Sequence, residues 1–88
     1  MKPEIDFDTA RSFSKGNRAQ LQKEQLCGCF YCRRIFQSGE IVEWYDDQGG
    51  TAVCPYCGID SVIGESSQIP ITPSFLNKMY QFWFTESD

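Results

Sequence analysis

The stretches that decide the fold are Cys27-Gly28-Cys29-Phe30-Tyr31-Cys32 and Cys54-Pro55-Tyr56-Cys57-Gly58. Each stretch contains a Cys-x-x-Cys pair, namely Cys29 with Cys32 and Cys54 with Cys57, and 21 residues separate the two pairs. Two thiolates on one tight turn can reach the same metal ion, and four sulfurs at about 2.3 Å complete the tetrahedron that Zn²⁺ adopts. The spacing therefore predicts one structural Zn²⁺ per chain, held by these four cysteines.

The residues between the two pairs predict a β-hairpin. The β-branched and aromatic residues of segment 40–45 indicate a strand, segment 46–50 ends in Gly-Gly and forms the loop, and segment 51–53 returns. This hairpin would bring the second cysteine pair back to the first. If segment 59–63 is a strand the core is a zinc ribbon, and if it is a helix the core is a treble clef.

The number and spacing of the cysteines also allow other interpretations. Disulfides are disfavoured because five cysteines is an odd number, and a redox Cys-x-x-Cys would need a βαβ setting for which the chain is short. Four cysteines can also hold iron, as in a rubredoxin-like site. The fifth cysteine, Cys27, is either a small buried hydrophobic residue or an alternative ligand in place of Cys29.

The flanking segments complete a small α+β fold. We expect residues 1–88 to form a single zinc-binding domain, with a helical N-terminal segment over 1–26, the zinc core over 27–64 and a C-terminal helix over 72–85. Asn17 is a candidate N-cap with Gln20 in the capping-box position, and Thr72 is an N-cap followed by Pro73. The cysteine-rich residues 27–36 contain a glycine break, so no regular element is predicted there.

The length and composition of the chain limit the functions that it can have. A chain of 88 residues is one small domain with a marginal core, for which a metal is a common support. The chain has no histidine, which excludes Ser-His-Asp and Cys-His catalysis within it. Four cysteine ligands would also close the zinc site to substrate. We therefore expect a protein that is not an enzyme.

The charge is unevenly distributed along the chain. Residues 1–34 carry seven Lys/Arg and four acidic residues, whereas residues 35–88 carry Lys78 and eight acidic residues, which together give the net charge of −4. An acidic body disfavours non-specific nucleic-acid binding. The basic N-terminal third, with Arg33 and Arg34 beside the first cysteine pair, is the one candidate for nucleic-acid contacts.

The cysteine motifs also resemble motifs of known protein families. The segment from Cys29 to Phe36 resembles the first knuckle of Cys-x-x-Cys-x-[Lys/Arg]-x-Phe zinc fingers, and the segment from Cys54 to Gly58 resembles the second knuckle of zinc ribbons. The combination CxCxxC with CPYCGIDSVIG, from Cys27 to Gly64, is similar to a family of small uncharacterised bacterial cytoplasmic proteins. That resemblance implies a fold and a compartment, and it implies no catalytic residue.

The expected role is a zinc-stabilised interaction module of the bacterial cytoplasm. A protein partner is favoured, with nucleic acid as the alternative. Three consecutive aromatic residues, Phe82, Trp83 and Phe84, crowd the end of the C-terminal helix, so a homodimer through this helix is a further hypothesis. The chain has neither a membrane-spanning run nor an apolar signal segment, so cytoplasmic localisation without a membrane partner is expected.

Overall fold

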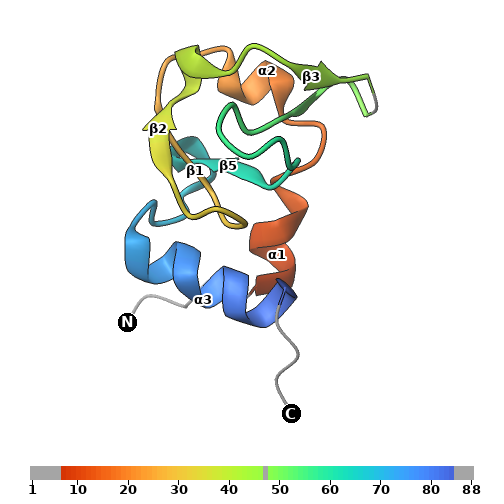
Figure 1. Ribbon diagram of the computed structural model, residues 1–88. Helices are drawn as coiled ribbons and strands as arrows, with labels where there is room; N and C mark the ends of the chain where they lie inside the picture. The colour runs from red at the N-terminus through yellow and green to blue at the C-terminus, as the bar shows by residue number, and fades with distance from the viewer. Residues whose placement is uncertain (1–6, 47, 85–88) are drawn as a thin grey trace.

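The fold is built around a small antiparallel sheet that separates two hydrophobic cores (Figure 1). The computed structural model describes residues 7–46 and 48–84; the opening residues, Asp47 of the expected hairpin loop and the chain beyond Phe84, including the last position of the expected 72–85 helix, lie outside them. The sheet has the strand order β2-β1-β5, with β1 (Leu26–Cys29), β2 (Ile35–Gln37) and β5 (Val62–Gly64). A second, two-stranded sheet pairs β3 (Trp44–Tyr45) with β4 (Thr51–Ala52). The helices are α1 (Phe7–Ser12), α2 (Arg18–Leu21) and α3 (Pro73–Phe84), and two 3-10 turns are η1 (Ser38–Glu40) and η2 (Glu65–Ser67).

Alternation along β1 assigns its side chains to the two cores. Cys27 and Cys29 point into the core that also contains Leu21, Phe36 and Val62, while Leu26 packs on the opposite core. Successive side chains of a strand face opposite sides of the sheet. The sheet is therefore the middle layer, with α2 and the β3–β4 hairpin on one side and α1 and α3 on the other (Figure 1).

Gly28 permits the close approach of α3 to the sheet. A Cβ at this position would lie 2.8 Å from Leu76 Cδ1 and 3.2 Å from Ile71 Cγ2. Leu76 and Met79 are fully buried, so α3 places its apolar face directly on β1. Thr72 caps this helix, because the Phe75 amide donates to Thr72 Oγ1 at 3.1 Å. The predicted C-terminal helix and its cap are confirmed over the described residues.

The hairpin prediction is confirmed in a shorter form. Trp44 pairs with Ala52 and Tyr45 with Thr51, so β4 returns the chain towards Cys54 as expected. The predicted strand over 40–45 is wrong for residues 40–43, since β3 contains only Trp44 and Tyr45. The Glu40 carboxylate accepts the Gln37 amide at 3.0 Å and closes the turn η1, and this local bond holds the chain out of the ladder.

The cysteine-rich segment 27–36 was expected to be irregular, and this expectation is wrong. Its ends form β1, the central strand, and β2, because Cys27 pairs with both Phe36 and Gly64. The same pairings hold Leu26 and Cys27 extended, so the helix expected up to residue 26 stops at Leu21. Long-range strand pairing thus overrides a good local helix propensity.

Asn17 occupies the N-cap position of α2, but its side chain does not cap the helix. Its Nδ2 donates to Phe13 O at 3.0 Å and to Val62 O at 2.9 Å, and its Oδ1 accepts the Ala52 amide at 3.0 Å. The residue is 3% exposed. Asn17 therefore joins the end of the α1 segment to both sheets, and the predicted capping box with Gln20 is wrong.

Among residues 7–46 and 48–84, no helix combines the length and the apolar character needed to cross a membrane.

We predict that Asn17→Ala lowers the free energy of unfolding by about 3 kcal/mol, because it leaves a buried amide and two carbonyls without their partner. The measurement is urea unfolding of the metal-loaded protein at fixed free metal. Asn77→Ala is the matched control, since Asn77 is exposed and, among the residues that the structure describes, its side chain bonds only to the Arg33 guanidinium. Equal losses for the two variants would contradict the bridging role of Asn17.

Candidate metal centre

Two loops with the same internal hydrogen bonds carry the four cysteines of the Cys-x-x-Cys pairs. In the first loop the Arg33 amide donates to Cys29 O at 2.7 Å, and in the second the Gly58 amide donates to Cys54 O at 3.0 Å. The Cys29 amide donates to Arg34 O and the Cys54 amide to Ile59 O, both at 3.0 Å. The two loops are equivalent knuckles that start at Cys29 and at Cys54.

Each knuckle also directs an amide at its first sulfur. The Tyr31 amide lies 3.4 Å from Cys29 Sγ, and the Tyr56 amide lies 3.4 Å from Cys54 Sγ. Amide donors of this kind favour the thiolate over the thiol. The repeated Cys-x-Tyr-Cys pattern is the sequence signal of this equivalence, and it does not enter the prediction from spacing alone.

Both knuckles turn through a left-handed residue directly after the second cysteine. Gly58 has φ +82°, as its position after Cys57 predicts, and Arg33 has φ +66° at the matching position. Glycine adopts this conformation freely, whereas a residue with a Cβ adopts it at a cost. The first knuckle therefore carries backbone strain that the second avoids.

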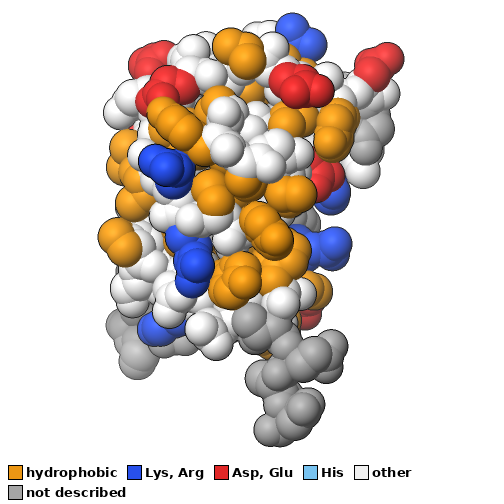
Figure 2. Space-filling model, in the orientation of Figure 1, with side chains coloured by type: hydrophobic (Ala, Val, Ile, Leu, Met, Phe, Trp, Pro, Cys, Tyr) orange, Lys and Arg blue, Asp and Glu red, His pale blue; other side chains and the backbone are white. Residues whose placement is uncertain are grey.

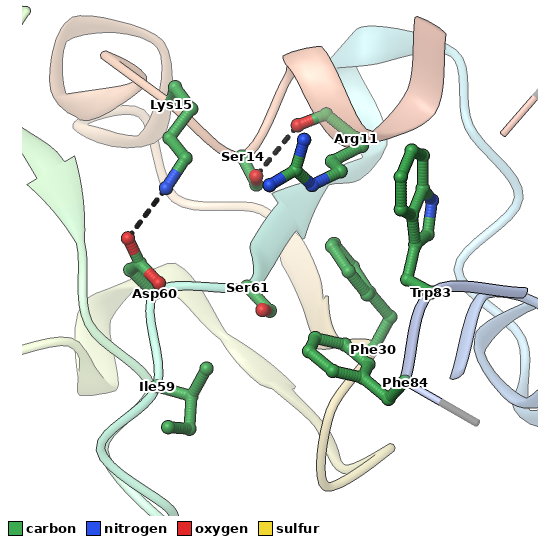
Figure 3. A pocket seen from close by; sticks show the side chains of 9 residues that line it. All are labelled: Arg11, Ser14, Lys15, Phe30, Ile59, Asp60, Ser61, Trp83 and Phe84. Carbon is green, nitrogen blue, oxygen red and sulfur yellow. Dashed lines mark hydrogen bonds and ion pairs between the residues drawn. The ribbon is translucent and has the colours of Figure 1, made fainter. Parts of the chain in front are cut away.

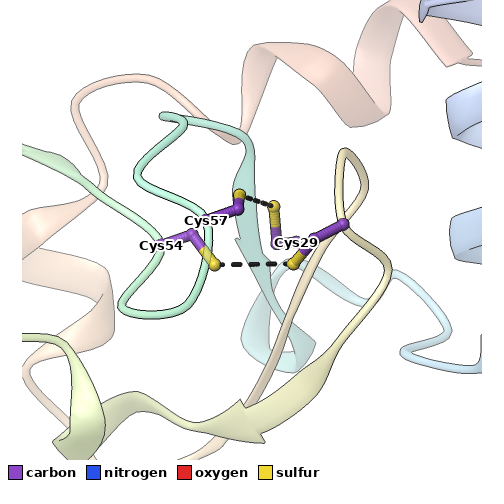
Figure 4. Close-up of side chains that lie close together, drawn as sticks. Cys29, Cys54 and Cys57 are labelled. Carbon is purple, nitrogen blue, oxygen red and sulfur yellow. Dashed lines mark hydrogen bonds between the residues drawn. The ribbon is translucent and has the colours of Figure 1, made fainter.

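The knuckles meet so that all four sulfurs lie within 4.8 Å of one another (Figure 4). Cys29 Sγ lies 3.7 Å from Cys57 Sγ, and Cys32 Sγ lies 3.7 Å from Cys54 Sγ. These distances are far longer than the S–S bond of a disulfide, which is about 2.05 Å, and all five cysteines are free. The four predicted residues thus form one group that can hold a metal ion, and each short contact joins one knuckle to the other.

Burial and hydrogen bonding set the proton affinities of the thiols. Burial raises the pKa of Cys29 well above its ordinary value and that of Cys57 to about 11. Burial acts in the same direction on Cys54, but bonds from the amides of Tyr56 and Cys57 outweigh it and lower that pKa. Since metals bind thiolates, a bound cation would displace the protons of these thiols.

Cys27 lies outside the group of four. Its side chain is fully buried among Leu21, Phe36 and Val62, and its Sγ approaches the Gln25 carbonyl at 3.9 Å. Burial, followed by the negative charges of Glu24 and Glu65, raises its pKa to about 12. Cys27 therefore has the environment of a hydrophobic core residue.

Arg33 and Arg34, the candidate nucleic-acid contacts, are both exposed beside the first knuckle. The Arg33 guanidinium lies 4.3 Å from the centre of the Tyr80 ring and donates to Asn77 Oδ1 at 3.0 Å. The Arg34 guanidinium lies 4.8 Å from the centre of the Tyr56 ring. Both side chains thus lie on aromatic rings.

A comparison with protein-family models, with curated proteins and with solved structures finds no match to this chain.

We predict that Gly58→Ala weakens metal binding about tenfold, because a Cβ in the left-handed region costs about 1–2 kcal/mol. No atom lies within 4 Å of that Cβ, so backbone strain is the whole effect. The measurement is competition with a chelator. In Gly39→Ala, the control, the new Cβ meets only the flexible end of Glu24 and φ is not positive, so little change is expected. Equal losses would contradict the role of the left-handed turn.

Proposed function

We propose that this protein is a non-enzymatic interaction module stabilised by one Zn²⁺. The observation that carries the proposal is the pair of 3.7 Å sulfur–sulfur distances across the knuckles. Four sulfurs at about 2.3 Å from a tetrahedral Zn²⁺ are separated by about 3.8 Å, so the sulfur group already has the dimensions of a zinc site. Zinc in such a site is worth about 10–16 kcal/mol, as much as the whole stability of a small domain.

The donor set favours a structural role for the ion. Cys29 and Cys54 are buried, Cys32 and Cys57 are half-buried, and the four sulfurs fill every position of a tetrahedron. A catalytic zinc keeps one position for water or substrate, which this donor set does not leave. The strand found at 62–64 matches the ribbon alternative of the sequence analysis, and we propose a ribbon-like zinc core.

An exposed aromatic patch supports an interaction role. We define the patch as Tyr31, Tyr80 and Phe84, whose rings pack edge to face or tilted at 4.9–6.0 Å. Tyr31 and Phe84 are each 40% exposed. Arg33 lies against the Tyr80 edge of the patch. Tyrosine and arginine around a partly exposed apolar centre are the residues enriched at protein–protein hot spots, so we propose a protein partner.

Nucleic acid is the second candidate, favoured by the arginines on exposed rings. Tyr56 is 50% exposed and carries Arg34, and bases stack on such tyrosines. On the face drawn in Figure 2, Lys and Arg side chains lie among hydrophobic ones, and the acidic side chains lie mainly towards the end that carries β3. The net charge of −4 and the bond between Tyr56 and Glu40 make a polyanion the less favoured partner.

The resemblance to small bacterial cytoplasmic proteins, and with it the compartment, stays a prediction. A homodimer through the end of α3 also stays a prediction, to which the structure adds that Phe82 is 53% exposed.

We predict one zinc per chain and one large loss of affinity per removed ligand. Native mass spectrometry of the purified protein should show a single zinc with five unmodified thiols. Cys29→Ala should lose the ion to a chelator that leaves the parent protein loaded, whereas Cys27→Ala should keep it, because Cys27 lies in the core. A bound iron, a disulfide, or loss of the ion in Cys27→Ala with its fold intact would contradict the zinc site.

The interaction surface is tested with the double variant Tyr31→Ser/Phe84→Ser. The matched control is Val42→Ser, since Val42 is 84% exposed and lies outside the patch. Quantitative affinity capture after nuclease treatment should recover partners that the control retains and the double variant loses. In parallel, binding to a fluorescent single-stranded oligonucleotide is measured against salt. Tight, salt-dependent oligonucleotide binding that is lost in Arg33→Gln/Arg34→Gln would favour nucleic acid and contradict the protein-partner proposal.

A further inference from the structure

A small pocket lies on the side of the fold away from the hairpin, where α1, the turn after β1, the segment before β5 and the end of α3 meet (Figure 3). Its volume is about 140 Å³. Pockets for drug-sized ligands or cofactors measure about 300–1,000 Å³, whereas an apolar cavity of about 150 Å³ holds a benzene molecule, so this one suits a ligand with a single small ring. Of its lining residues, the proposed function uses only Phe84.

The pocket holds one cation without an anionic partner among the described residues. Lys15 and Asp60 form an ion pair at 2.7 Å, which neutralises both at one end of the pocket. The Arg11 guanidinium lies 4.7 Å from the centre of the Trp83 ring, and it makes no ion pair within residues 7–46 and 48–84. A guanidinium that makes no ion pair keeps its N–H groups available for a carboxylate, which it binds with two parallel hydrogen bonds.

A buried hydroxyl adds a second polar group. Ser61 is 5% exposed, and its side chain makes no hydrogen bond to another residue in the described part of the chain. Every fully enclosed side-chain nitrogen or oxygen of these residues has a partner. The Ser61 hydroxyl therefore opens onto the pocket that it lines, where it can donate to a ligand oxygen.

The rest of the lining is largely aromatic. Phe30 is buried to 1% exposure, its ring lies 5.8 Å from that of Phe84, and Trp83 completes the wall (Figure 3). A ligand that fits this lining has an apolar ring against Phe30 and Phe84 and an anionic group at Arg11. We propose that the pocket binds a small aromatic monocarboxylate of the size of benzoate, with Arg11 and Ser61 as the groups that recognise the carboxylate.

The test is an NMR titration of the intact, zinc-loaded protein with sodium benzoate. Benzoate should shift the amide signals of Arg11, Ser61 and Trp83 saturably, with intermolecular contacts between its ring protons and the Trp83 indole. Benzyl alcohol, which has the same ring without the charge, should bind at least about tenfold more weakly, because it lacks the bidentate carboxylate.

Two variants and one matched control identify the side chains that bind the carboxylate. Arg11→Met should weaken benzoate binding at least about tenfold, and Ser61→Ala should weaken it severalfold. Arg18→Met removes an equivalent arginine–tryptophan contact, that of Arg18 with Trp44 at 5.2 Å, away from the pocket and should leave binding unchanged. Signal dispersion and zinc content show that each variant is folded.

Absence of saturable shifts up to high millimolar benzoate would overturn the proposal. Equal affinities for benzoate and benzyl alcohol, or equal losses in Arg11→Met and Arg18→Met, would overturn it as well. If Arg11→Met does not fold, Ser61→Ala and the contacts to Trp83 decide alone. None of these outcomes depends on whether the aromatic patch binds a protein.

Discussion

The structure depends on the meeting of four sulfurs between two knuckles. Each knuckle orders itself, because a turn of two hydrogen bonds and an amide aimed at its first sulfur fix the loop from Cys29 and the loop from Cys54. The hydrogen bonds within each knuckle do not hold the two knuckles together. The two 3.7 Å sulfur pairs each cross from one knuckle to the other, so a metal held there joins the strands that follow. Thiols whose pKa is raised by burial would otherwise remain neutral and provide only weak contacts.

The sheet transmits this constraint to the rest of the chain. Cys29 ends β1 and contributes to the core on the hairpin side. The Leu76 side chain packs against Gly28, one residue earlier, from the other side of the sheet. A displacement of the first knuckle would therefore disturb the packing of α3 as well. The aromatic patch combines Tyr31 of that knuckle with Tyr80 and Phe84 of α3, so the proposed interaction surface exists only when both layers are in place.

The prediction from sequence was strongest where the chemistry is local. The four cysteines and the Thr72 cap each depend on a few neighbouring residues, and each is found as expected. It was weakest where distant segments compete. Segment 27–36 lacks the alternation of a strand, yet β1 becomes the central strand because β2 and β5 both pair with it. Asparagine is a common N-cap residue, but the Asn17 side chain is already hydrogen-bonded to the buried backbone of Val62 and Ala52.

The sequence by itself determined the small α+β class, the set of four cysteines on two tight turns and the amphipathic C-terminal helix. It did so because cysteine spacing, turn residues and helical periodicity are short-range properties of the chain. The tertiary structure alone decided that segment 62–64 is a strand, that Cys27 belongs to the core, and that Arg11, Ser61 and Trp83 line one pocket. These features join residues up to 72 positions apart, such as Arg11 and Trp83, and only packing around the shared sheet brings such residues together.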